Sequence, residues 1–89
     1  MTAALGHDEV LAVVQAASAT VLELDPTTVT RETRFRDDLQ ADSLGLVEIV
    51  EIVEEELAPR ARPGFHIEDE DLDGLRTVGE AVDYALARL

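Results

Sequence analysis

Apolar residues recur at helical spacing in three stretches of the chain. In the first, residues 8–24, they fall on one stripe, and the acids Asp8 and Glu9 occupy the first turn, which predicts an amphipathic helix. We expect this helix to end at Asp25 and Pro26, because the residue before a proline is pushed out of the helical region. The stripe consists of Val10, Val13, Val14, Ala17, Val21 and Leu24.

The second stretch, residues 43–57, has two faces on a helical wheel of about 100° per residue. The face predicted to meet the core consists of Leu46, Ile49, Val50, Val53 and Leu57. The other mixes apolar and acidic residues, namely Ser43, Leu44, Val47, Glu48, Glu51, Glu54 and Glu55. Such a mixture is typical of a docking surface for basic partners, and a solvated face with two chance apolar residues is the alternative.

The third stretch begins at Thr77, where Thr77 and Glu80 have the spacing of a capping box. The buried stripe of this last helix is predicted to be Val78, Val82, Ala85 and Leu89.

Two connections separate the three helices. Residues 26–42 combine threonines and charges with a few apolar anchors, which predicts an ordered loop pinned to the core by Val29, Phe35 and Leu39. Between the last two helices, prolines and a glycine leave room for only a short helical turn around Leu72. No run alternates with period two. We therefore predict an all-α small four-helix bundle, three main helices plus a short third helix, as a single domain over residues 1–89.

Composition narrows the functional classes. The chain has no cysteine, two histidines and a net charge of −13, so neither a disulfide framework nor a zinc cluster is expected. The negative charge disfavours nucleic acid and anionic membranes and favours basic protein surfaces. The sequence shows no secretory signal and no apolar run long enough for a membrane span. We expect a monomer in the cytoplasm.

Ser43 lies at the head of the second helix without a base to activate it. A serine hydrolase needs a histidine beside the serine, but His7 and His66 fall near the terminus and in an irregular loop, and no G-x-S-x-G motif occurs. We expect no catalytic residues. Ser43 could cap the helix, although Asp42 could do the same. The remaining option is modification, because a phosphate ester at a helix start would meet free backbone N–H groups and the positive end of the helix dipole.

Three segments together resemble the acyl carrier protein family. They are "LELDPTTVT", "TRFRDDLQADSLGLVEIVEIVEEEL" and "TVGEAVDYAL", with Asp42-Ser43-Leu44 as the attachment motif, and they cover most of the chain. The resemblance implies a four-helix bundle in which Ser43 receives 4′-phosphopantetheine from coenzyme A through a phosphopantetheinyl transferase. The protein would then carry acyl groups as thioesters and would not itself be an enzyme.

The resemblance also implies a partner-binding surface. Acids on the second helix would meet Arg or Lys on docking patches of the transferase and of acyl-loading, condensing and acyl-processing enzymes. The residues that correspond to this surface are Asp37, Asp38, Asp42, Leu44, Val47, Glu48, Glu51 and Glu54.

The sequence departs from the family pattern at several positions. Gln40 stands where glycine is common, Gly45 lies in the first turn of the recognition helix, and Glu51 occupies a place that is often apolar. The loop 58–67, with Arg60 and Arg62, is longer than in compact fatty-acid carriers and either contacts a cargo or partner or is an insertion-tolerant surface loop. Polyketide or other specialised biosynthesis, fatty-acid synthesis and an aminoacyl or peptidyl carrier of a nonribosomal pathway stay open.

Two hypotheses from other functional classes are alternatives to an acyl carrier. Residues 69–80, "DEDLDGLRTVGE", match a calcium-loop pattern with Asp69, Asp71, Asp73 and Glu80 as ligands. Against calcium, prolines interrupt the entering helix, and Glu80 is already explained by the capping box, so no metal is the main expectation. The other reading is a carrier-like interaction domain that is never loaded, with Ser43 serving only as a cap.

Overall fold

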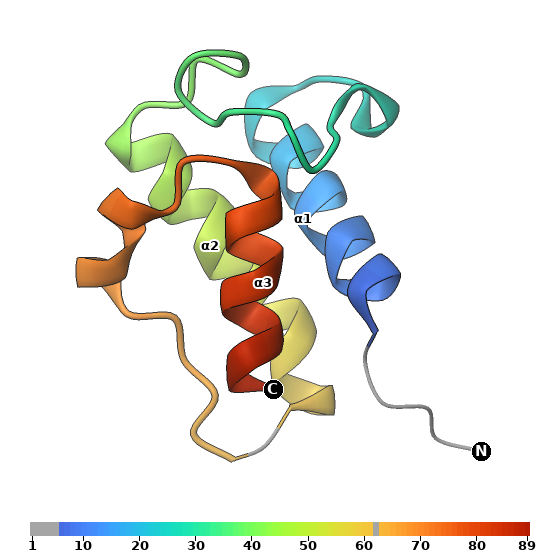
Figure 1. Ribbon diagram of the computed structural model, residues 1–89, viewed down its shortest axis with the longest axis vertical. Helices are drawn as coiled ribbons and strands as arrows, with labels where there is room; N and C mark the ends of the chain where they lie inside the picture. Colours follow the sequence, from blue (N-terminus) through green and yellow to red (C-terminus); the bar gives the residue numbers. More distant parts are fainter. Residues whose placement is uncertain (1–5, 62) are drawn as a thin grey trace.

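Three α-helices and three short 3₁₀ helices make up the part of the chain that the structure describes, residues 6–61 and 63–89 of a computed structural model. The α-helices are α1 (His7–Leu22), α2 (Ser43–Leu57) and α3 (Val78–Arg88), and the 3₁₀ helices are η1 (Pro26–Thr28), η2 (Ala58–Arg60) and η3 (Asp69–Gly74) (Figure 1). The all-α prediction is confirmed, and its short third helix is η3. Within these ranges no helix is long and apolar enough to cross a membrane.

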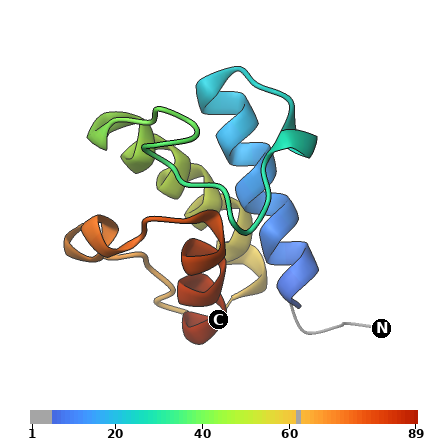
Figure 2. The same ribbon diagram turned by 45° about the horizontal axis from the view of Figure 1, so that its top comes forward.

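α1 is the central packing element of the bundle. It lies against both α2 and α3, whereas in the described ranges no Cα atom of α2 lies within 8 Å of one of α3. Figures 1 and 2 show α2 and α3 side by side, with η3 close to their upper ends. Side chains therefore fill the space between α2 and α3, and η3 also contacts α2.

The core confirms the predicted apolar faces. The side chains of Val10, Val14 and Ala17 from α1 are buried, and Val13, Val21 and Leu24 are partly buried against them. All five predicted residues of α2 are buried, as are three of the four from α3, Leu89 being only half-buried. The long connection supplies Val29 at 0% exposure and Phe35 at 1%, with Leu39 packed at the edge.

α1 ends two residues before the predicted boundary. Glu23 takes a left-handed backbone conformation with φ 55°, and its N–H donates to the carbonyl oxygen of Ala19, which closes the helix after Leu22. Pro26 then starts η1, whose first turn is capped by the carboxylate of Asp25. The proline thus marks the next element, and the helix has already ended at Glu23.

The loop before α2 is joined to the start of α3 by backbone hydrogen bonds. Phe35 N–H donates to Arg76 O at 3.0 Å, and Val78 N–H and Gly79 N–H donate to the carbonyl oxygens of Thr33 and Arg31, both at 2.9 Å. A Cβ on Gly79 would lie 3.0 Å from the Arg31 carbonyl oxygen, so glycine permits this approach. The loop then turns back on itself through Ala41 N–H to Phe35 O at 2.8 Å.

The connection between α2 and η3 is fastened at several points. Glu54 Oε1 accepts from Ile67 N–H at 2.7 Å and lies 2.8 Å from His66 Nδ1, while Arg60 pairs with Glu9 of α1 at 3.3 Å. Ile67 is buried and Phe65 packs partly against the core. Residues 58–61 and 63–67 therefore form a tethered loop, and the expected contribution of Arg62 lies outside the described residues.

We expect Phe35→Ala to lower the free energy of unfolding by about 3–5 kcal/mol, because it empties the site that anchors the loop before α2. Phe65→Ala is the matched control, since that ring is only partly buried and should cost clearly less. Urea unfolding followed by circular dichroism measures both. Equal losses for the two variants would contradict the anchoring role of Phe35.

Gln40 is predicted to be a strained position, because its φ is 56° and only glycine adopts that region readily. Relief of about 1–2 kcal/mol of left-handed strain is partly offset by glycine's larger entropy loss, roughly 0.5–1 kcal/mol. Gln40→Gly should therefore stabilise the fold by about 0.5–1 kcal/mol in thermal or urea unfolding. Gln40→Ala keeps the Cβ atom and should not; a gain equal to that of the glycine variant would argue against backbone strain.

Candidate functional site

Ser43 is the first residue of α2 and its side chain is exposed. The helix cap is Asp42, whose Oδ1 accepts a hydrogen bond from Gly45 N–H at 2.7 Å. Of the two capping candidates, the structure thus assigns the role to Asp42. The hydroxyl of Ser43 is left available at the helix N-terminus.

Gly45 makes room for this cap. An added Cβ at this position would lie 3.3 Å from Asp42 Oδ1 and 3.8 Å from Leu22 Cδ2, so a larger residue would crowd the carboxylate. The glycine in the first turn of α2, which the sequence marks as a departure from the family pattern, has a local packing reason.

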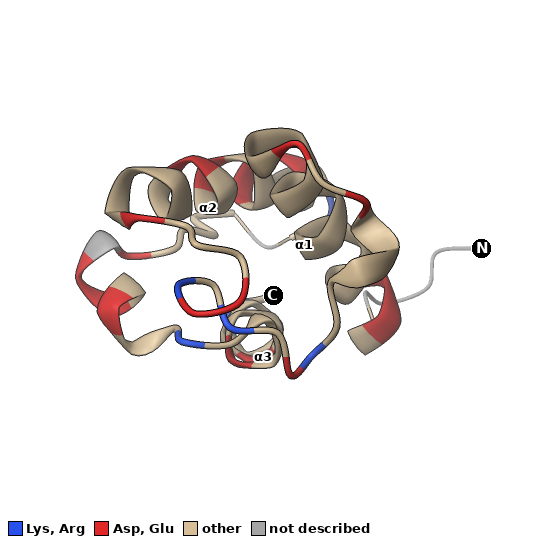
Figure 3. Cartoon of the chain, turned by 90° about the horizontal axis from the view of Figure 1, so that it is seen from above, with Lys and Arg blue, Asp and Glu red and all other residues tan. Residues whose placement is uncertain are grey.

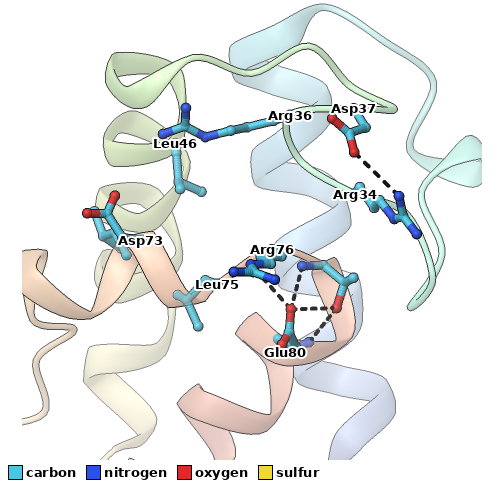
Figure 4. A pocket seen from close by; sticks show the side chains of 10 residues that line it. Arg34, Arg36, Asp37, Leu46, Asp73, Leu75, Arg76 and Glu80 are labelled. Atoms are coloured by element: carbon cyan, nitrogen blue, oxygen red, sulfur yellow. Dashed lines mark hydrogen bonds and ion pairs between the residues drawn. The ribbon is translucent and has the colours of Figure 1, made fainter.

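Arg36 reaches across from the preceding loop to the serine. Its Nη2 donates a hydrogen bond to Ser43 Oγ at 3.1 Å, and Figure 4 shows its guanidinium extending toward α2 above Leu46. Arg36 was not among the site residues predicted from the sequence. The available signal was its position seven residues before Ser43 in a chain with only seven basic residues.

A small pocket opens beside Ser43, and a larger one shares part of its lining. The smaller, about 190 Å³, is lined by Arg36, Ser43, Leu46, Val47, Leu72 and Asp73. The larger, about 800 Å³, shares four of these residues and continues toward the η3–α3 junction, where Leu75, Arg76 and Glu80 lie (Figure 4). Because Arg36, Leu46, Leu72 and Asp73 line both, the two pockets adjoin each other.

Several of the residues predicted to bind partners are exposed on α2. Leu44 is 66% exposed, the one large apolar side chain found exposed in residues 6–61 and 63–89, and it adjoins Ser43. Glu48 and Glu51 are exposed further along the helix, while Val47 is half-buried, and Figure 3 shows acidic segments recurring along α2. Asp37 and Asp38 sit in the loop: Asp37 pairs with Arg34 at 3.4 Å, and Asp38 accepts from Arg34 N–H at 2.8 Å.

Glu54 differs from the other acids of the predicted surface. Its side chain is 31% exposed, and its carboxylate is the acceptor that holds Ile67 and His66. The structure thus gives Glu54 a fastening role inside the chain in addition to its place on the wheel, and it does not present Glu54 as freely as Glu48 or Glu51.

The residues of the calcium-loop alternative make other contacts in the described parts of the chain. Glu80 Oε1 accepts from Arg76 N–H and Thr77 N–H at 3.0 and 2.9 Å, and the Thr77 backbone bond above all lowers the pKa of this carboxyl. Asp71 accepts from Tyr84 Oη and Arg88, and Asp73 lies at the pocket edge; the side chain of Asp69 lies outside the described residues. Among those that are described, no three acidic, histidine or cysteine side chains gather as metal ligands. Asp71 and Glu80 thus have internal partners, Asp71 within η3 and Glu80 in the first turn of α3.

Comparison with known proteins decides the family. The family model described as "Phosphopantetheine attachment site" matches residues 12–85. The chain is 40% identical over 82 residues to the acyl carrier protein of Rubrobacter xylanophilus, covering 92% of this chain and 94% of that protein. The chain belongs to the acyl carrier protein family.

Two further comparisons agree with this assignment. The carrier is 40% identical over 81 residues to the meromycolate extension acyl carrier protein of Mycobacterium leprae, which is 91% of this chain but 65% of the length of that relative. The solved structure of the acyl carrier protein from Enterococcus faecalis superposes with a TM-score of 0.71 at 33% identity, covering 96% of this chain and 100% of the other.

Members of this family are carriers and hold a covalent 4′-phosphopantetheine group. When attached, the group supplies a flexible arm with a terminal thiol on which acyl groups ride as thioesters. The residues present fit such a group, because an exposed hydroxyl, a guanidinium beside it and an adjoining pocket meet at the start of α2.

We expect Asp42→Ala to destabilise the carrier by about 1 kcal/mol, since it removes the N-cap acceptor of α2. Ser43→Ala should change stability by no more than about 0.5 kcal/mol, because the hydroxyl is exposed and is not the cap. Thermal unfolding of the two single variants tests this contrast. A larger loss for Ser43→Ala than for Asp42→Ala would reverse the assignment of the cap.

Proposed function

We propose that Ser43 is the residue to which 4′-phosphopantetheine is attached and that residues 1–89 act as one carrier domain for acyl thioesters. The observation that supports this most directly is the division of roles at the start of α2. Asp42 caps the helix, so the hydroxyl of Ser43 is exposed beside a pocket and free to be modified.

The loading step needs a base from outside the chain. The two histidines of the sequence contact other groups: His7 contacts Arg31 and Asp8, and His66 contacts Glu54. We propose that a phosphopantetheinyl transferase supplies the base. Ser43 Oγ then attacks the phosphorus of coenzyme A that bears the pantetheine, a new O–P bond forms, adenosine 3′,5′-bisphosphate leaves, and the hydroxyl proton passes to the transferase's base.

The surface of α2 supports docking to basic partners. Leu44 offers an apolar contact next to Ser43, and Glu48 and Glu51 extend an acidic strip away from it. Charges at the rim of an interface govern encounter rate and salt dependence more than final affinity. Weak, fast exchange suits a carrier that visits the transferase and then loading, condensing and processing enzymes in turn. That it acts as a monomer in the cytoplasm stays a prediction from the sequence.

The cargo that we propose is an acyl group of fatty-acid or polyketide and related specialised biosynthesis. The relatives support acyl cargo, since they are acyl carriers and several are named for meromycolate extension. An aminoacyl or peptidyl cargo is the second candidate, and loading assays with each class of thioester separate the two.

Intact-mass measurement tests the proposal. After incubation with coenzyme A, magnesium and a broad-specificity transferase, the wild-type chain should gain one phosphopantetheine, and Ser43→Ala should gain none. Ser18→Ala is the matched control: Ser18 is the other serine of the sequence, its side chain is buried on α1 and donates to Val14 O, and this variant should load normally. Loading of Ser43→Ala, or no gain in the folded wild-type chain, would refute the proposal.

A further inference from the structure

Arg36 differs from most arginines of this acidic chain, although Arg76 too forms no ion pair with a carboxylate in residues 6–61 and 63–89. In residues 6–61 and 63–89, four arginines pair with carboxylates: Arg31 with Asp83, Arg34 with Asp37, Arg60 with Glu9 and Arg88 with Asp71. The contact found for Arg36 in the same ranges is the neutral hydroxyl of Ser43. A guanidinium that contacts a neutral hydroxyl in so acidic a chain is available to bind an anion, such as a phosphate group attached to that hydroxyl.

The geometry places that charge within reach. Arg36 Nη2 lies 3.1 Å from Ser43 Oγ, the atom that becomes the ester oxygen once the arm is attached. The free oxygens of the phosphodiester then lie one phosphorus atom further out, next to the same guanidinium. Guanidinium groups bind phosphate oxygens through short, charge-assisted hydrogen bonds that are stronger than those to a neutral oxygen.

Arg36 is the residue beside Ser43 that can bind a phosphate group in this way. It is the single cation among the six residues that line the smaller pocket, and Asp73 on the opposite wall repels an anion. The N-terminus of α2 adds a favourable dipole at the same point. A phosphodiester on Ser43 therefore meets a positive potential on the loop side and a negative one at η3.

We propose that Arg36 is a positioning residue that forms an ion pair with the phosphodiester of the arm and turns its first bonds toward the pocket between α2 and η3. This inference rests on attachment at Ser43. The arm then begins at the pocket that Leu46 and Leu72 line and leaves the exposed Leu44 accessible to partner enzymes.

The strength of the pair suits a carrier. Both groups are at the surface, so the pair biases the arm by about two- to fivefold, and salt weakens it. A partner enzyme with its own basic residues can replace Arg36 and draw the arm away. A buried pair would hold the arm too firmly for repeated release.

Phosphorus NMR of the loaded full-length chain tests the proposal. Arg36→Gln should shift the phosphodiester resonance and remove most of its dependence on salt concentration. Arg34→Gln is the matched control, with the same loss of charge two residues away but a contact to Asp37 in place of Ser43, and it should leave the resonance near the wild-type position. In proton–nitrogen spectra, loading should perturb the amides of Leu72 and Asp73 in the wild-type chain and less in Arg36→Gln.

The outcomes separate this inference from the proposed function. Equal phosphorus spectra for wild-type, Arg36→Gln and Arg34→Gln, all fully loaded by mass, would overturn the role of Arg36 while leaving attachment at Ser43 intact. Equal shifts in both variants would show a general charge effect and also overturn it. A chain that gains no mass at Ser43 would refute the proposed function instead. Arg36 is exposed, so its variant is expected to fold, and the amide spectrum checks this directly.

Discussion

The backbone hydrogen bonds between residues 31–35 and residues 76–79 determine where every part of the site lies. They tie the long loop to the start of α3, while Phe35, buried at 1% exposure, fixes the same loop to the core. Because Ala41 N–H bonds back to Phe35, the residues just before α2 are placed by the same anchor. Without these hydrogen bonds, Ser43, Arg36 and the pocket would not be held in fixed positions relative to one another.

Two adjacent residues at the start of α2 have different tasks. Asp42 caps the helix, which leaves the hydroxyl of Ser43 without a capping role. Helix initiation needs an acceptor for a free backbone N–H, and Asp42 supplies it. A modification site needs an exposed oxygen without structural duty, and Ser43 supplies that. A serine that capped the helix would lose its hydrogen bond each time it was modified. If Ser43 carries the arm as we propose, this separation lets the modification proceed without loss of the helix cap.

Four of the arginines pair with carboxylates of the chain itself, while several acids on α2 stay exposed. Arg31, Arg60 and Arg88 join segments that are distant in sequence, each through a carboxylate. Glu54 likewise holds the loop before η3. What stays exposed on α2 is an apolar contact at Leu44 and acids that lead away from it, which suits rapid, salt-sensitive encounters with basic surfaces.

The sequence by itself determined the helices, their buried faces, the capping box at Thr77 and the family motif around Ser43, because these depend on periodicity and on neighbours within four residues. Tertiary structure alone decided the rest. It brought the Arg36 guanidinium to Ser43 Oγ, put Gln40 in a left-handed conformation and joined Asp71 of η3 to Tyr84 of α3. Such contacts depend on how a loop folds back on a helix, and local spacing does not encode the path of a loop whose anchor, at residues 76–79, lies some forty positions along the chain.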